Sequence, residues 1–509
     1  MNVLATTVFG VIFAFVTLLG FFAGRWRRGD LTQLHEWGLG GRRFGTIVTW
    51  FLLGGDLYTA YTFIAVPALI YGGGAIGFFA VPYTILIYPI LYVVFPRLWT
   101  IARQRGHVTA ADYVQDRFGN RWLGLAVSLT GLIATMPYIA LQLVGMAVVI
   151  GALGFQASGL VGDIPLIIAF VILAAFTYTS GLRAPAMIAV VKDALVYLTV
   201  FAAVIAVPLA LGGFAPVFSA VPAAKLLLAV PPAGSLGGYS AYATLALGSA
   251  VALFLYPHSL TAILSSSSAA VIRRNAAILP AYSFLLGLLA LLGFMALAMG
   301  VGGMARFSAG FARFGTNYAV PALFLAVFPA WFVGVAFAAV AIGALVPAAI
   351  MSIAAANIFT RNIWRAFLRP GCTDAEEAEV AKLASLGVKV GALFFIIFLP
   401  QQYAIQLQLL GGVWIIQTAP AVMLGLFCPW LNGWALLLGW AAGIGWGTAM
   451  AAALSFKSAV YPLQLLGLTM PGYAALYALA LNLVVSAVLS LLFNIARHSG
   501  PRGLAAKPG

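Results

Sequence analysis

Residues 50–74 read WFLLGGDLYTAYTFIAVPALIYGGG and combine an apolar helix with features that interrupt one. Gly54 and Gly55 precede a carboxylate at Asp56, Pro67 follows, and three glycines end the stretch. A carboxylate in hydrocarbon is costly unless it is paired or functional. Irregular backbone at membrane depth is tolerated only where it lines a cavity. The stretch therefore predicts a membrane helix broken near its middle, with Asp56 at the break as a candidate ion, proton or substrate contact.

The composition of the whole chain agrees with a membrane setting. The chain has 509 residues, of which 63% are hydrophobic and 7% charged, and its mean hydropathy is +1.07. A soluble domain carries about a quarter charged residues, so soluble enzymes and disordered chains are excluded. The net charge of +15 is expected in cytoplasmic loops and not in a nucleic-acid site. Cys372 and Cys428 lack metal-type spacing, so no disulfide or zinc site is expected.

Thirteen apolar stretches are long enough to cross about 30 Å of hydrocarbon. They are residues 3–23, 47–70, 76–94, 123–150, 164–178, 186–211, 242–264, 278–299, 331–359, 383–399, 407–426, 434–454 and 473–493. If the N-terminus is outside, all of the 26 Lys and Arg residues fall in cytoplasmic segments except four: Lys225, Arg306, Arg313 and Lys457. Because cytoplasmic loops carry the excess of positive charge, this predicts an outside N-terminus and a cytoplasmic C-terminus.

A second interruption lies in FLYPHSLTAILSSSS, residues 254–268. Pro257 removes a backbone donor there, and His258 and Ser259 add polar side chains. Each interruption begins a set of five stretches, and because five is odd the second set must be inverted. The predicted organisation has five parts: an extra N-terminal transmembrane helix and cytoplasmic loop (1–44), a first five-helix repeat (45–211), an extracellular loop (212–240), a second, inverted repeat (241–428), and two C-terminal transmembrane helices with a cytoplasmic tail (429–509).

Four motifs in order resemble the sodium:solute symporter family. They are GGRRFG (40–45), the broken helix (51–74), TAADYVQDRFGNR (109–121) and YTSGLRAPAMIAVVKDA (178–194). The resemblance covers nearly the whole chain and implies an all-α leucine-transporter-type fold of two inverted five-helix repeats. Residues 256–282, 347–364 and 407–422 look closest to the bacterial monocarboxylate permeases of that family, which carry lactate, pyruvate and sometimes alanine.

The resemblance also implies a cation site near the first break. Its implied ligands are the carbonyls of Gly55, Tyr58 and Ala349 and the hydroxyl of Ser352. Asp56 is a further candidate beside them, as a charged ligand or as a proton carrier. Family members commonly have a second serine where this chain has Ile353, so the coupling ion is Na⁺ or H⁺. If the missing hydroxyl weakens a sodium site, Ile353→Ser is expected to strengthen sodium dependence. No cofactor is expected, and no metal other than sodium.

Substrate recognition is expected to use neutral donors, because the sequence places no Lys or Arg at mid-depth in a core helix. The candidates are Tyr58, Thr62, Gln142, Tyr256, His258 and Gln417. Both glutamines equally suit hydrogen bonds between helices. Asp193 follows Lys192 in the sixth stretch and suits either a pairing within that helix or an ion release path.

The resemblance and the breaks together favour a cation-coupled symporter that imports small monocarboxylates by alternating access. Its expected location is the bacterial cytoplasmic membrane, with the lipid bilayer and a small acid as its partners. The alternatives are a symporter of the same fold for another small organic solute, a passive channel, and a membrane enzyme or sensor using Asp56 and His258. No nucleophile elbow, His-Glu metal motif or phosphate loop occurs in the sequence, which argues against an enzyme. The sequence indicates no particular protein partner.

Overall fold

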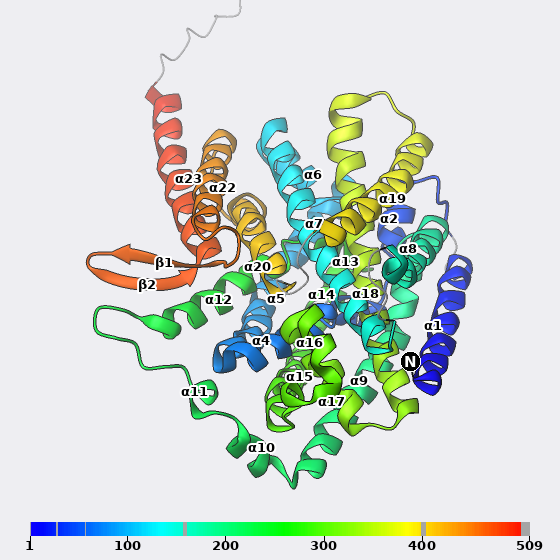
Figure 1. Cartoon of the computed structure of the whole chain (residues 1–509). Coiled ribbons are helices and arrows are strands. Elements are labelled where there is room, and N and C mark those ends of the chain that lie inside the picture. The colour runs from blue at the N-terminus through cyan, green and yellow to red at the C-terminus, as the bar shows by residue number, and fades with distance from the viewer. Residues whose placement is uncertain (1, 27–28, 56, 156–159, 399–403, 500–509) are drawn as a thin grey trace, which may run out of the picture.

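A computed structural model of the 509-residue chain describes residues 2–26, 29–55, 57–155, 160–398 and 404–499. Helices dominate it (Figure 1). The first part comprises α1 (Val3–Phe22), η1 (Ala23–Arg25), α2 (Leu34–Leu39), η2 (Gly40–Arg42), α3 (Thr46–Gly55), η3 (Tyr61–Ala65), α4 (Val66–Gly73), η4 (Gly74–Phe79), α5 (Ala80–Arg105), α6 (Ala110–Phe118), α7 (Arg121–Ala152), α8 (Leu160–Ser180) and α9 (Arg183–Leu211).

The remaining elements follow a long connection that carries α10 (Phe214–Ala220) and α11 (Ala223–Leu226). They are α12 (Gly237–Leu253), α13 (Pro257–Leu264), α14 (Ala269–Ile278), α15 (Pro280–Ala298), η5 (Val301–Gly303), η6 (Ala305–Phe307), α16 (Ser308–Phe314), η7 (Gly315–Tyr318), α17 (Ala319–Val327), α18 (Ala330–Ile358), η8 (Phe359–Leu368), α19 (Asp374–Phe398), α20 (Ala404–Ile415), η10 (Ile416–Thr418), α21 (Ala419–Val422), η11 (Leu424–Leu426), α22 (Gly433–Ala453), β1 (Val460–Leu465), β2 (Leu468–Tyr473) and α23 (Ala474–Ser499).

Each predicted apolar stretch is mostly helical in the structure. Among the described residues, nine helices are long and apolar enough to span a membrane, or ten if the bent pair α12 and α13 counts as one span. Helix α3 and residues Ile164–Ser180 of α8 are apolar but shorter. In Figure 1, α1 and α23 both run upward, as expected for the first and last of an odd number of spans.

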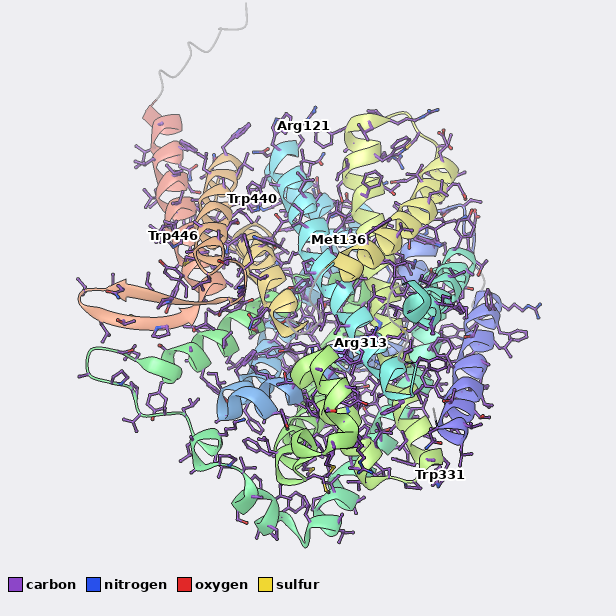
Figure 2. All side chains as sticks on the ribbon, viewed as in Figure 1. Arg121, Met136, Arg313, Trp331, Trp440 and Trp446 are labelled. Carbon is purple, nitrogen blue, oxygen red and sulfur yellow. The ribbon has the colours of Figure 1, made fainter. Side chains whose placement is uncertain are left out.

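Helices α7 and α18 form the centre of the molecule. In their most apolar windows 83% and 94% of residues are buried, against 17% for α1 and 28% for α23. Figure 2 marks the upper end of α7 with Arg121 and the lower end of α18 with Trp331. Helices α7 and α18 therefore lie side by side, and both contact the broken helices. Helices α1, α22 and α23 cover the flanks of the molecule (Figure 1).

Both predicted helix breaks are present. The first separates α3 from η3, directly after the pair Gly54 and Gly55. The second separates α12 from α13, where the axis bends by 48° and Tyr256 takes an extended conformation before Pro257. Because a proline ring suits the first position of a helix, Pro257 begins α13 where a continuous helix would have lost a hydrogen bond.

A β-hairpin between α22 and α23 was not predicted from the sequence. Strands β1 and β2 pair antiparallel, with Leu465 opposite Leu468 at the turn. The two turn residues, Leu466 and Gly467, have φ angles of 51° and 80°, as a type I′ turn requires. Both strands lie almost entirely between the predicted stretches 434–454 and 473–493, in a connection to which no secondary structure was assigned from the sequence.

Candidate transport site

The first break exposes backbone carbonyls, and a lysine binds them. The Lys192 ammonium of α9 donates hydrogen bonds to the Gly55 carbonyl at 2.7 Å and to the Tyr58 carbonyl at 3.2 Å. A Cβ atom at Gly55 would stand 2.8 Å from the Lys192 Nζ atom, so glycine permits this approach. The two carbonyls that the sequence assigned to a coupling cation are therefore occupied by a side-chain cation.

An acidic residue and two tyrosines complete this arrangement. Lys192 Nζ lies 3.0 Å from Asp193 Oδ1, and both side chains have 0% exposure. The Tyr282 hydroxyl of α15 donates to Asp193 Oδ2 at 2.6 Å, and the Tyr58 hydroxyl donates to the Tyr282 carbonyl at 2.7 Å. The pairing of Lys192 with Asp193, one of two readings of Asp193 from the sequence, is present. It lies deep in the protein and ties α9 to α15 and the broken helix.

The expectation that no lysine lies at mid-depth in a core helix is wrong. Helix α9 begins at Arg183, so Lys192 lies about 13 Å along its axis, and the long side chain reaches further. Lys192 and Lys389 are among the basic residues expected in cytoplasmic segments, yet both are buried. Lys389 donates to the hydroxyls of Thr177 and Ser385 at 2.9 and 2.8 Å.

Three backbone amides begin the second half of the broken helix, residues 61–73. The N–H groups of Thr59, Ala60 and Tyr61 donate to neutral side-chain oxygens, each at 3.0 Å. The acceptors are the hydroxyls of Thr62 and Thr59 and the amide oxygen of Gln142 on α7. First-turn amides of a helix carry partial positive charge and favour anions.

The second break is lined by aromatic rings. The His258 ring lies 5.2 Å from that of Tyr138 and 5.4 Å from that of Tyr256, centre to centre. The Tyr256 hydroxyl donates to the Gln408 carbonyl at 3.0 Å. Tyr138 lies one turn before Gln142 on α7, and the Gln142 amide donates to the Tyr138 carbonyl at 3.4 Å. One stretch of α7 therefore contacts both breaks and brings most of the predicted substrate residues together.

The implied cation ligands on α18 lie apart from those on the broken helix. A Cβ atom at Gly343 would stand 3.9 Å from the Tyr58 carbonyl oxygen, which marks where α18 approaches the break. Ser352 lies nine residues further on, about 13 Å along the helix. Its hydroxyl donates to the Ala349 carbonyl at 2.8 Å and accepts from Ser385 at 3.3 Å. These contacts join Ser352 to the cluster around Lys389.

The structure places Gln417 in contacts between helices, whereas it does not describe Asp56. Gln417 donates to the Val413 carbonyl at 3.1 Å, and its side-chain oxygen accepts from Asn482 of α23 at 3.2 Å. These are the interhelical contacts that the sequence held as the alternative for Gln417. Asp56 lies outside the described residues, so its role at the break stays a prediction.

A polar network joins the two repeats at the end that the sequence assigns to the cytoplasm. Asn362 of η8 donates to Asp112 at 2.6 Å and accepts from the Thr109 hydroxyl at 2.7 Å. Arg42 donates to the His107 carbonyl. Burial lowers the pKa of Arg42 to about 10, which leaves it charged at neutral pH.

A narrow cavity lies next to the second break, beside this polar network. Its lining includes Thr109, Gly131, Pro257, Thr261, Ile358 and Thr418. The lining is mostly apolar and comes from both repeats. Thr109 belongs to both the polar network and the cavity lining, so the two adjoin.

Comparison with known proteins agrees with this architecture. A monocarboxylate transport permease protein of Rhizobium johnstonii is 53% identical over 499 residues, covering 96% of this chain and 97% of that protein. The uncharacterized symporter YodF of Bacillus subtilis is 33% identical over 434 residues, covering 85% and 84%.

A solved structure shows that the fold is shared. The substrate-bound outward-open state of a Na⁺-coupled sialic acid symporter matches with a TM-score of 0.75 and 15% identity, covering 96% of this chain and 98% of that one. The predicted leucine-transporter-type fold is thus confirmed. The profile of the sodium:solute symporter family matches residues 37–443. The chain therefore belongs to the sodium:solute symporter family and is a multi-pass membrane symporter.

Proposed function

We propose that this protein imports small monocarboxylates, with the substrate carboxylate bound at the start of the second half of the broken helix. The observation that supports this most directly is the set of three amides at Thr59, Ala60 and Tyr61, which point at neutral oxygens. A carboxylate offers the same kind of acceptor with a full negative charge, which the helix N-terminus favours. The permease name of the 53% identical relative supports the same substrate class.

The surroundings of these amides suit a short acid with a small apolar body. Tyr58, Thr62 and Gln142 flank them, and Tyr256 and His258 lie across α7 at the second break. In this proposal the carboxylate takes the place of the Gln142 oxygen on the Ala60 amide, and the Gln142 NH₂ group turns to donate to the carboxylate. The aromatic rings contact the carbon chain. The two breaks then move with their repeats during alternating access.

Uptake by proteoliposomes tests the substrate class. We expect saturable uptake of labelled lactate and pyruvate that unlabelled monocarboxylates inhibit. Lactamide keeps the size of lactate without its charge and should not compete, and succinate should fail because of its second carboxylate. Saturable uptake that lactamide inhibits as well as lactate does would contradict carboxylate recognition.

Replacing Gln142 should weaken substrate binding. Gln142→Met keeps the length of the side chain and removes the NH₂ group proposed to donate to the carboxylate. We expect the KM for lactate to rise about tenfold, because one hydrogen bond at a buried charged site contributes on the order of 1.5 kcal/mol. Gln417→Met is the matched control, a buried glutamine bonded to α23, and should leave KM unchanged. Equal KM changes in the two variants would argue against the assignment.

We also propose that the protein lies in the bacterial cytoplasmic membrane with its N-terminus outside and its C-terminus in the cytoplasm. Cys372 is only 6% exposed and would report poorly on topology. With both native cysteines changed to alanine, Gly371→Cys should react with an impermeant thiol reagent only after the cells are opened. Val230→Cys, where valine is 84% exposed, should react in intact cells. The reverse labelling pattern would show that the topology is opposite to the one proposed.

A further inference from the structure

The sodium ion that the family implies does not fit the carbonyl pair at the first break. Gly55 and Tyr58 both accept hydrogen bonds from Lys192 Nζ, at 2.7 and 3.2 Å. Asp193 Oδ1 lies 3.0 Å from the same nitrogen. Two of the three ammonium donors bind these carbonyls, and the ammonium also forms an ion pair with the carboxylate. The lysine is held as a ligated cation would be, by two carbonyls and one carboxylate.

A sodium ion at the same pair would meet this ammonium. Two positive charges about 3 Å apart repel strongly where water is excluded, and a buried cation needs a counter-charge. The one described carboxylate in contact with the ammonium, Asp193, already pairs with Lys192. Sodium would have to displace the Lys192 ammonium from these oxygens. Because Lys192 is fully buried, the displaced ammonium could not bind bulk water in their place.

Where α18 faces the break, its described residues nearest the Tyr58 carbonyl offer sodium no side-chain oxygen. Gly343 marks the approach of α18 to the Tyr58 carbonyl. The residues one turn further along the same face, Val346 and Pro347, carry no oxygen in their side chains. A hard cation seeks about six oxygens. The hydroxyl that the resemblance implied, on Ser352, is bonded within the Lys389 cluster instead.

We infer that Lys192 is the resident cation of this site and that the transporter works without sodium. The arrangement fills the carbonyl pair that the resemblance implied for sodium, so of the two coupling ions that the sequence leaves open it favours H⁺. The inference depends on the proposed substrate only for its uptake readout, since sodium binding is measured without any substrate.

Two measurements on the wild-type protein test the inference. Purified protein in detergent should show no saturable binding of radiolabelled sodium. Proteoliposomes should take up labelled lactate at the same rate with an inward sodium gradient as with an inward choline gradient, at equal pH on both sides. Saturable sodium binding, or uptake that rises with sodium and saturates, would overturn the inference.

Matched lysine variants test the role of the ammonium. Lys192→Met keeps the length of the side chain and removes its charge, and we expect uptake to fall about tenfold or more because Asp193 is left buried without its counter-charge. Lys225→Met is the control, because Lys225 also donates to a backbone carbonyl, that of Tyr71 at 2.7 Å, but at the other end of the half-helix. The control should transport within about twofold of wild type. A folded Lys192→Met protein with wild-type uptake would contradict the proposed role.

These measurements separate the inference from the proposed function. If no monocarboxylate is taken up and sodium still does not bind, the substrate proposal fails and the inference stands. If lactate is taken up and sodium binds, the inference fails and the substrate proposal stands. Should Lys192→Met not fold, the sodium measurements on the wild type still decide.

Discussion

Asp193→Asn is expected to destabilise the protein more than any other single polar substitution at the site. The change keeps the size of the side chain but leaves the Lys192 ammonium buried without a counter-charge. Breaking a buried ion pair from one side costs about 3–5 kcal/mol. Thermal unfolding of the purified protein in detergent measures the loss, and lactate uptake should fall with it.

Changing Lys192, the ion-pair partner of Asp193, tests whether the loss comes from the unpaired charge. When Lys192→Met is added to Asp193→Asn, neither charge remains, so the double variant should be more stable than the sum of the two single losses predicts. Tyr282→Phe removes one hydrogen bond to Asp193 Oδ2 and keeps the ion pair. Its cost should be smaller, about 1.5–3 kcal/mol. Additive losses in the double variant would show that the two charges do not interact as the distances imply.

The fold could be predicted because its determinants are local. Paired glycines at Gly54 and Gly55 and the proline at Pro257 interrupt helices wherever those helices lie, and apolar length identifies membrane stretches without tertiary information. Both breaks appear in the structure where these residues placed them. The hairpin of β1 and β2 was missed because each short strand carries a proline, Pro462 or Pro471, which argues against a strand in a sequence pattern.

The centre of the site could not be predicted in the same way. Lys192 was seen beside Asp193 and read as half of a local pair, because sequence proximity says nothing of where a side chain about 6 Å long ends. One observation could have raised the alternative: a buried ammonium has three donors, and Asp193 alone cannot satisfy them. The carbonyls freed by the broken helix, which the resemblance implied for a coupling cation, are the acceptors that Lys192 uses.

The cation ligands on α18 failed to assemble for a related reason. Ser352 and Ala349 have suitable oxygens, and their chemistry can be read from the sequence. Which residue of α18 faces the break cannot. That residue is Gly343, and Ser352 lies nine residues, or about 13 Å, further along the helix. Ile353 is buried in the same region of α18. A hydroxyl introduced by Ile353→Ser would therefore lie far from the Tyr58 carbonyl. The expected gain of sodium dependence follows only if α18 moves along its axis, so the substitution now tests that movement.

The close approach of α7 to the first break gives the second large prediction. A Cβ atom at Gly145 would stand 2.2 Å from the Cβ of Ala60 and 3.3 Å from its Cα. Gly145→Ala must push the break away from α7, which pulls the Ala60 amide off the Gln142 oxygen now 3.0 Å away. Overpacking of this kind costs about 1–3 kcal/mol. If the cost falls on the substrate-bound state, the KM for lactate should rise roughly tenfold to a hundredfold.

The matched control uses the same substitution where space is open. An added Cβ at Gly287 of α15 meets no atom within 4 Å. Both variants gain helix propensity, about 1 kcal/mol for alanine over glycine, so intrinsic helix stability cannot distinguish them. Only Gly145→Ala disturbs the amides proposed to hold the carboxylate. If lactate uptake is normal in both variants, α7 does not fix the geometry of the break, and the substrate must be held by groups other than the Ala60 amide.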